Sequence, residues 1–250
     1  MKKSFGRVVN EVIEDADITL EVIDARFMNE MRNPYIEKKI QEKKKQRIVV
    51  VNKCDYLSEE EIVQLKKTFR DYVFLSATKH MGIGSLFRAI RMKKGIIKKK
   101  EIVIGVVGYP NVGKSSVINA LKGRHSAPTS SEAGFTKGKQ KLRISGDMLM
   151  IDTPGVMAHS KTQVEELTVL GAKNPSSIKD PDLAVFRLMA MYPNIIEEHY
   201  GILRAGYKEQ RLEQIALKYN LKLREGKPDT EQMARRILME WQKGKIKRKI

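Results

Sequence analysis

Residues 108–116 read GYPNVGKSS, and the apolar run EIVIGVVG at 101–108 leads into them. Gly108, Gly113, Lys114 and Ser115 match the pattern G-x-x-x-x-G-K-[ST], which forms a phosphate-binding loop where it joins a strand to a helix. The β-branched run predicts a buried strand, and residues 114–121 predict the helix. The stretch therefore predicts a nucleotide-binding α/β fold.

The residue types in this loop suit an anionic ligand. Gly108 and Gly113 allow the backbone to turn its N–H groups inward, and the helix presents its positive N-terminus to the same anion. Lys114 would reach the β- and γ-phosphates, and the Ser115 hydroxyl would bind Mg²⁺. The residues expected to bind nucleotide here are Asn111, Val112, Gly113, Lys114, Ser115 and Ser116.

A second motif, Asp152-Thr-Pro-Gly155, ends another predicted strand. Asp152 is expected to hold the magnesium ion opposite Ser115, and the Gly155 N–H is expected to face the γ-phosphate. Thr136, in the polar loop 130–140, would close over Mg²⁺ when the γ-phosphate is present. The predicted metal ligands are Ser115, Thr136 and Asp152, and the predicted catalytic residues are Lys114, Thr136 and Gly155.

A third motif, Asn52-Lys53-Cys54-Asp55, follows the apolar run 47–52. Asp55 could accept two hydrogen bonds from guanine, whereas adenine would leave its carboxylate unpaired. Asn52 would either tie the loop or contact the guanine edge, and Lys53 would lay its stem over the base. One strand later, Ser76-Ala77 could donate a backbone N–H to the guanine carbonyl oxygen.

Six short apolar runs alternate with helical patterns over the first part of the chain, which predicts a mostly parallel six-stranded sheet covered by helices. The runs are 18–24, 47–52, 72–77, 101–108, 141–145 and 148–152. The last two flank Gly146-Asp147, a hairpin signal. The pattern after residue 160 is helical only. We therefore expect two domains, a nucleotide-binding domain at 1–160 and an all-helical domain at 161–250.

The order of the motifs is unusual, because GTP-binding domains normally have the phosphate loop first and the guanine-reading motif last. Here NKCD precedes GYPNVGKS. With ADITLEVIDAR (16–26), MRNP (31–34) and the tail GKPDTEQMARRILMEWQKGKI (226–246), the chain resembles the circularly permuted GTPases of the YlqF/YawG type, the ribosome biogenesis GTPase A group. The resemblance implies GTP and GDP with Mg²⁺ as ligands, GTP hydrolysis, and a role in assembly of the large ribosomal subunit.

The residue after Gly155 is Val156, where many GTPases have a glutamine that orients the attacking water. Slow intrinsic hydrolysis, stimulated by the ribosome, is therefore expected. Asn111 resembles an asparagine that helps related GTPases to hold potassium, so K⁺ is a further candidate cofactor. His159 follows this segment and could act on the attacking water, or it could be an ordinary solvated loop histidine.

The composition supports a polyanionic partner, with 48 basic and 30 acidic residues and a net charge of +18. The basic runs 93–100, 137–143 and 243–250 are candidate phosphate contacts with rRNA. The one cysteine excludes an internal disulfide and a cysteine-based zinc finger, and no apolar run suits a signal peptide or a membrane span. We expect a cytoplasmic protein with no membrane or disulfide-linked partner. The sequence leaves the oligomeric state open, with a monomer favoured.

Two alternatives remain open at this point. The chain could be a GTP-dependent switch that acts on another RNA or on a protein, or a GTP-binding RNA module without efficient hydrolysis.

Overall fold

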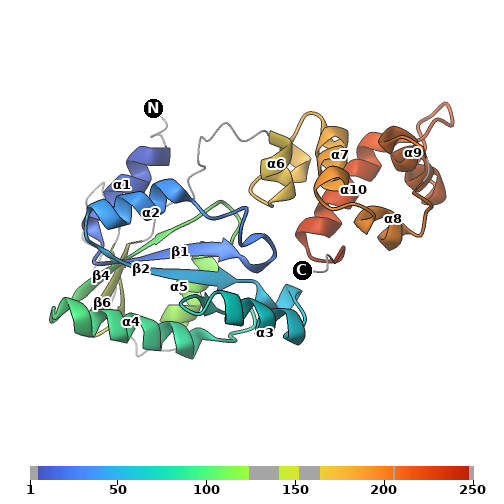
Figure 1. Ribbon diagram of the computed structural model, residues 1–250. Coiled ribbons are helices and arrows are strands. Elements are labelled where there is room, and N and C mark those ends of the chain that lie inside the picture. Colours follow the sequence, from blue (N-terminus) through green and yellow to red (C-terminus); the bar gives the residue numbers. More distant parts are fainter. Residues whose placement is uncertain (1–4, 124–140, 152–163, 205, 248–250) are drawn as a thin grey trace. The chain divides into compact units, whose positions relative to one another are not determined.

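The computed structural model describes residues 5–123, 141–151, 164–204 and 206–247. The chain divides into two compact units, residues 1–159 and 160–250, each with its own core (Figure 1).

The first unit is built on a six-stranded sheet with the order β3-β2-β1-β4-β6-β5. The strands are β1 Ile18–Asp24, β2 Gln46–Asn52, β3 Val73–Phe74, β4 Ile102–Val107, β5 Lys141–Ser145 and β6 Met148–Ile151. All neighbours are parallel except β5 and β6, which form the predicted antiparallel hairpin. Every residue of β1 is buried, because a strand inside a parallel sheet is covered on both faces. The predicted mostly parallel six-stranded sheet is confirmed.

Helices cover both faces of this sheet (Figure 1). On one face lie α1 (Phe5–Asp15) and α2 (Pro34–Glu42), and on the other lie α4 (Ile83–Ile97) and α5 (Lys114–Gly123). The helix α3 (Glu59–Thr68) connects β2 to β3. A buried apolar cluster packs α1 and α2 against β4; its members are Val9, Val12, Ile13, Ile36, Ile40 and Val107. Each such side chain contributes about 1.5–3 kcal/mol on burial.

Local sequence signals set several element ends. The Ser58 hydroxyl accepts from the Glu61 N–H while the Glu61 carboxylate accepts from the Ser58 N–H, and this capping box starts α3. The strand predicted at 72–77 is shorter, since β3 ends at Phe74. Beyond it, the Ser76 N–H and C=O pair with Met81 in a turn instead of continuing the ladder.

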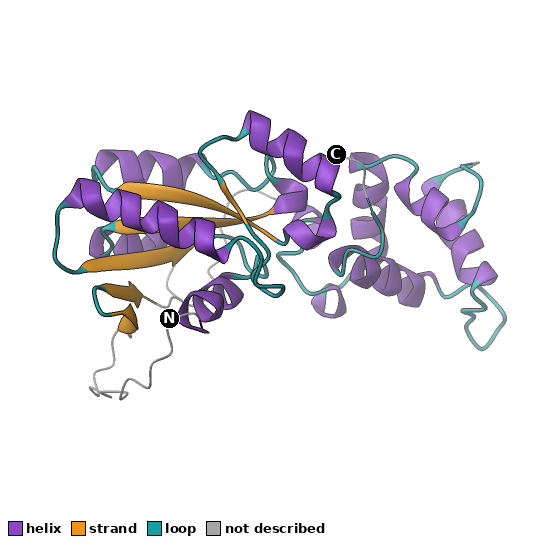
Figure 2. Cartoon of the chain, turned by 90° about the horizontal axis from the view of Figure 1, so that it is seen from below, coloured by secondary structure: helices purple, strands orange, loops and turns teal. Residues whose placement is uncertain are grey.

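The second unit contains helices and loops but no named strand among its described residues (Figure 2). Its helices are α6 Val164–Val169, α7 Pro181–Met191, α8 Ile195–Tyr200, α9 Lys208–Lys218 and α10 Thr230–Gln242. Trp241 is buried at the end of α10, and its indole N–H donates to the Val169 carbonyl at 2.7 Å. Asp229 caps the start of α10, and Gly244 lies just beyond its end with φ +71°, a conformation that favours glycine.

Within the described parts of both units, every helix is too short or too polar to span a bilayer.

Candidate nucleotide-binding site

The GYPNVGKSS stretch forms the turn between β4 and α5. Three of its residues have left-handed backbone: Gly108 at φ +146°, Asn111 at +61° and Gly113 at +93°. A Cβ on Gly108 would lie 2.3 Å from the Val22 carbonyl oxygen, so only glycine permits this approach of the loop to β1. The turn therefore has the curled backbone that an anion-binding loop requires.

Lys114 begins α5 and is buried. Its ammonium donates to the carbonyl oxygens of Gly108 at 3.1 Å and Tyr109 at 2.7 Å, both within its own loop. Burial lowers the pKa of Lys114 to about 8. A buried cation that carbonyl groups alone satisfy is the feature expected where a phosphate binds, so this loop suits a nucleotide polyphosphate.

The first turn of α5 carries both predicted serines. Ser115 is exposed and Ser116 is half-buried. The Val117 N–H donates to the Gly113 carbonyl at 2.9 Å, so the helix is formed from its first turn. An exposed hydroxyl at this helix start suits a role as one Mg²⁺ ligand.

Asn52 joins three separate segments of the chain. It ends β2, its amide donates to the Val112 carbonyl at 2.8 Å, and its side-chain oxygen accepts from the Ala77 N–H at 3.0 Å. A Cβ on Gly113 would lie 2.3 Å from the Asn52 amide nitrogen. Of the two roles predicted for Asn52, the geometry is that of a tie between the NKCD loop and the phosphate-binding loop.

Asp55 lies in the short 3-10 turn η2 (Cys54–Tyr56). Its side chain is exposed, and its carboxylate has no recorded partner among the described residues. It is therefore available to accept hydrogen bonds from a ligand. Lys53, the residue before this turn, has φ +66°, and its ammonium lies 2.9 Å from Asp24 Oδ2.

The Ser76-Ala77 turn differs in one respect from its predicted role. The Ser76 N–H donates to the Met81 carbonyl at 3.0 Å, and the Ala77 N–H donates to Asn52 Oδ1. Both backbone donors thus have protein acceptors in this structure. For Ala77 to bind a guanine carbonyl oxygen, its bond with Asn52 must be shared or exchanged.

Several predicted residues lie outside the described part of the chain: Thr136, Asp152, Gly155, Val156 and His159. The strand that leads to Asp152 is described. Ile151 ends β6 opposite Gly105 of β4, the strand that leads into the phosphate-binding loop. The described residues contain no cluster of three histidine, cysteine or acidic side chains able to hold a metal ion by themselves.

Residues 16–26 belong to the stretches that resemble the YlqF/YawG GTPases, but the sequence alone assigned no role to Asp24. The structure places this buried carboxylate against both Arg26 and Lys53, at the base of the NKCD loop. The signal for it was an aspartate at the end of a mostly apolar strand, with one residue between it and an arginine. Cys54 is also buried here, and burial raises the pKa of its thiol.

The basic runs are only partly described. Residues 93–100 cover the end of α4, and Lys243 to Lys247 follow α10. Of the run 137–143, only 141–143 is described, on β5, where Arg143 pairs with Glu101 at 2.8 Å.

Comparison with known proteins gives consistent matches. The profile of a family described as 50S ribosome-binding GTPase matches residues 103–219. An uncharacterized GTP-binding protein of Methanocaldococcus jannaschii is 35% identical over 245 residues, which is 96% of this chain and 65% of the relative. Nuclear/nucleolar GTPase 2 of Arabidopsis thaliana is 30% identical over 260 residues, 98% of this chain and 44% of that protein. The chain thus spans less than two-thirds of these relatives.

Solved structures with the same fold include YlqF from T. maritima. Its GNP-bound form aligns with a TM-score of 0.68 at 21% identity, covering 96% of this chain and 94% of that one. The fold and the order of its loops along the chain define a P-loop GTPase domain with circularly permuted motifs. The chain therefore has the fold of the solved YlqF structures, and the sequence relatives that it matches are named as GTP-binding proteins or GTPases.

Proposed function

We propose that this chain binds GTP and GDP with Mg²⁺, hydrolyses GTP, and acts in assembly of the large ribosomal subunit. The observation that carries the proposal is the Asn52 side chain, which bonds both to the phosphate-binding loop at Val112 and to the Ser-Ala turn at Ala77. One residue therefore couples the segments that would bind the base to the segment that would bind the phosphates.

In this proposal each described segment has a distinct part. Asp55 accepts hydrogen bonds from the guanine ring N–H and its exocyclic amine. Lys114 exchanges its carbonyl partners for the β- and γ-phosphate oxygens, and Ser115 contributes a hydroxyl to Mg²⁺. Asp152, Thr136 and Gly155 keep their predicted roles at the metal and the γ-phosphate.

Hydrolysis is proposed to be slow in the isolated protein. Val156 cannot hydrogen-bond to a water, so the group that orients the nucleophile would come from elsewhere, with the ribosome as the expected source. Asn111 is the proposed contact for K⁺, whose charge would stabilise the transition state in place of an arginine. Faster turnover in K⁺ than in Na⁺, abolished in Asn111→Ala, is the expected result.

The proposed ribosomal partner is supported by the relatives named nucleolar GTPases and by the charge of the chain. On the GTPase unit, the best candidate for an rRNA contact is α4. Residues 79–100 contain no acidic side chain, and α4 buries Ile83, Leu86, Phe87 and Ile90 while leaving Met92 and Ile96 exposed. The exposed cations of this segment include Arg88, Arg91, Lys98 and Lys100.

Contacts between these cations and RNA phosphates would be salt-dependent and largely independent of sequence. Replacing Arg88 and Arg91 by glutamate is expected to reduce the salt dependence of RNA binding. An unchanged slope would remove α4 from the proposal.

The central experiment measures GTP hydrolysis with purified large ribosomal subunits, comparing the wild type with Lys114→Ala. The expected result is turnover that the subunits stimulate and that the variant lacks. Co-sedimentation with large subunits only in the GTP-analogue state separates a ribosomal role from a switch on another RNA or protein. Turnover that no subunit stimulates would favour the non-hydrolysing RNA module. A cytoplasmic location and a monomeric state stay predictions.

A further inference from the structure

We propose that Asp24 sets the selectivity for guanine, although it does not contact the base, by clamping both sides of Asp55 through Lys53 and Arg26. The inference rests on the proposed guanine-nucleotide function and adds a positioning residue that lies outside the phosphate-binding loop, NKCD and DTPG.

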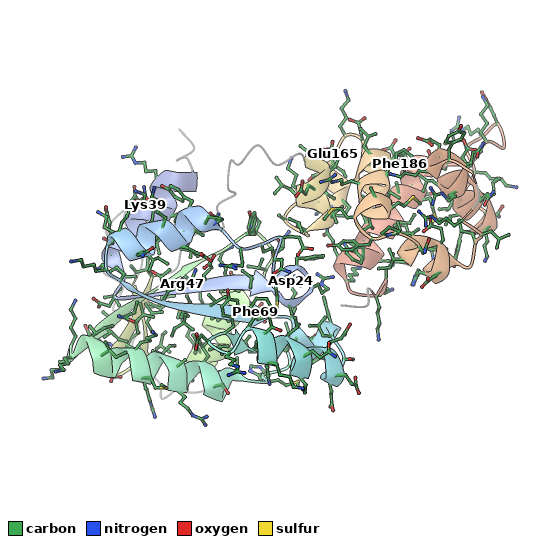
Figure 3. The ribbon with its side chains drawn as sticks, viewed as in Figure 1. Asp24, Lys39, Arg47, Phe69, Glu165 and Phe186 are labelled. Carbon is green, nitrogen blue, oxygen red and sulfur yellow. The ribbon has the colours of Figure 1, made fainter. Side chains whose placement is uncertain are left out.

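Asp24 is placed where it can act on the base-reading loop. It is the last residue of β1, opposite Asn52 at the end of β2 in the parallel register, and it is fully buried (Figure 3). Its Oδ1 accepts from the Arg26 backbone N–H and from Arg26 Nε, each at 3.0 Å. Its Oδ2 accepts from Arg26 Nη2 at 2.8 Å and lies 2.9 Å from the Lys53 ammonium.

The first arm of the clamp fixes the residue on the amino-terminal side of the turn that holds Asp55. Lys53 has a left-handed backbone at φ +66°, a conformation that non-glycine residues adopt only when their surroundings hold them in it. No side chain caps the start of η2. The ion pair with a buried carboxylate therefore restrains the Lys53 side chain, in addition to the backbone bond that the Lys53 carbonyl accepts from the Tyr56 N–H at 3.0 Å.

The second arm acts on the other side of Asp55. The guanidinium of Arg26, oriented by its bonds to Asp24, lies 4.6 Å from the centroid of the Tyr56 ring. Arg26 is itself buried, so this cation–π contact is shielded from water. Residues 53 and 56 thus bracket Asp55, and both are tied to the same carboxylate, one directly and the other through Arg26.

Backbone bonds hold the turn itself, since the Cys54 N–H donates to the Leu75 carbonyl at 3.2 Å and the Tyr56 N–H donates to the Lys53 carbonyl at 3.0 Å. The contacts of Asp24 add a side-chain restraint on both sides of Asp55, whose own side chain is exposed. The proposed contacts of Asp55 include the exocyclic amine of guanine, which hypoxanthine lacks. A hydrogen bond between this amine and a carboxylate corresponds to a preference of about tenfold or more for GTP over ITP. If the clamp holds Asp55 in place, loosening the clamp must lower this ratio, whereas contacts with the phosphates must survive.

The test measures the affinities of GTP, ITP and inorganic tripolyphosphate, each with Mg²⁺, for the wild type and Asp24→Asn. The expected result is that the GTP-to-ITP ratio of the variant falls to about threefold or less while tripolyphosphate binding is unchanged. Asp17→Asn is the matched control. Asp17 lies just before β1 at the opposite end and pairs with Lys99, away from the loop, so its variant should keep the wild-type ratio.

A second variant covers the case in which Asp24→Asn does not fold, since it leaves two cations without their anion. Tyr56→Leu removes the second arm but leaves all bonds of Asp24 intact, and it should lower the ratio partially. Wild-type ratios in Tyr56→Leu and in any folded Asp24→Asn protein would overturn the clamp. An equal loss of all three ligands would also overturn it, because that result indicates a structural role only. A wild-type protein that fails to prefer GTP over ITP would instead contradict the proposed guanine site itself.

Discussion

The affinity for nucleotide should fall as the pH rises through 8, because a buried lysine must be charged to bind phosphate. Without ligand, burial lowers the pKa of Lys114 to about 8, and among the described residues its ammonium donates to the carbonyl oxygens of Gly108 and Tyr109. A bound polyphosphate favours the charged form and returns the pKa toward or above its ordinary value. Binding is therefore coupled to uptake of a proton above pH 8.

The size of the effect follows from the fraction of protein in which Lys114 is already charged. With a pKa of about 8, this fraction falls from roughly nine-tenths at pH 7 to roughly one-tenth at pH 9, so the dissociation constant should rise about tenfold, or about 1.4 kcal/mol. Below pH 7 this residue should contribute no further change. Calorimetry at pH 8 in buffers of different ionisation enthalpy should register uptake of about half a proton per GDP bound.

Lys114→Arg is the control for this measurement. Arginine stays charged across the range, and the ionisations of the nucleotide itself affect both proteins equally. The variant is expected to bind more weakly at every pH but without the added inflection near pH 8. If the wild type and Lys114→Arg show the same pH dependence between 7 and 9, the reasoning from burial is refuted.

Three further predictions concern stability. Gly113→Ala should lower the free energy of unfolding by about 1–3 kcal/mol, since φ is +93° and the new Cβ would lie 2.3 Å from the Asn52 amide nitrogen. The control is Gly95→Ala, which should be neutral or stabilising because Gly95 is helical and its new Cβ would have no atom within 4 Å. Urea denaturation compares the two variants with the wild type. Burial raises the pKa of Glu21 to about 7, so the stability that comes from its protonated form is lost as the pH rises from 4.5 to 7. The unfolding free energy of Glu21→Gln should therefore increase relative to that of the wild type over this interval. A difference between the two proteins that stays constant with pH would contradict this prediction. Arg211→Met should destabilise the helical unit by about 3–5 kcal/mol, because it leaves the buried carboxylate of Glu197 without its cation. Fluorescence of the single tryptophan reports the midpoint of unfolding, and a midpoint equal to that of the wild type would argue against the ion pair.

Much of the fold could be predicted because its signals are local. The β-branched runs identified all six strands, and Ser58 with Glu61 fixed the start of α3. The helix α1 was missed, although Val9, Val12 and Ile13 have helical spacing, because the N-terminal stretch was judged only as a possible signal peptide. The strand at 72–77 was predicted too long, since its last residues bond across a turn to Met81.

The candidate site was predictable as a set of motifs but not as a set of contacts. The phosphate-binding loop is contiguous, so its glycines, lysine and serine could be read from the pattern. The bonds of Asn52 to Val112 and Ala77, and of Asp24 to Lys53, join residues that are distant in sequence and meet at the ends of β1, β2, β3 and β4. Their pairing depends on strand register, which a single sequence does not contain.

The central claim is that segments 52–55 and 108–116 bind one guanine nucleotide, and exchanging the base tests it most directly. Asp55→Asn replaces an acceptor by a side chain that also donates, which suits the 2-carbonyl of xanthine in place of the 2-amine of guanine. Calorimetric titration of GTP and XTP should show that the variant loses about 10²-fold or more in GTP affinity and gains affinity for XTP, with Mg²⁺-tripolyphosphate binding retained. Equal GTP affinity in the wild type and Asp55→Asn would contradict the account.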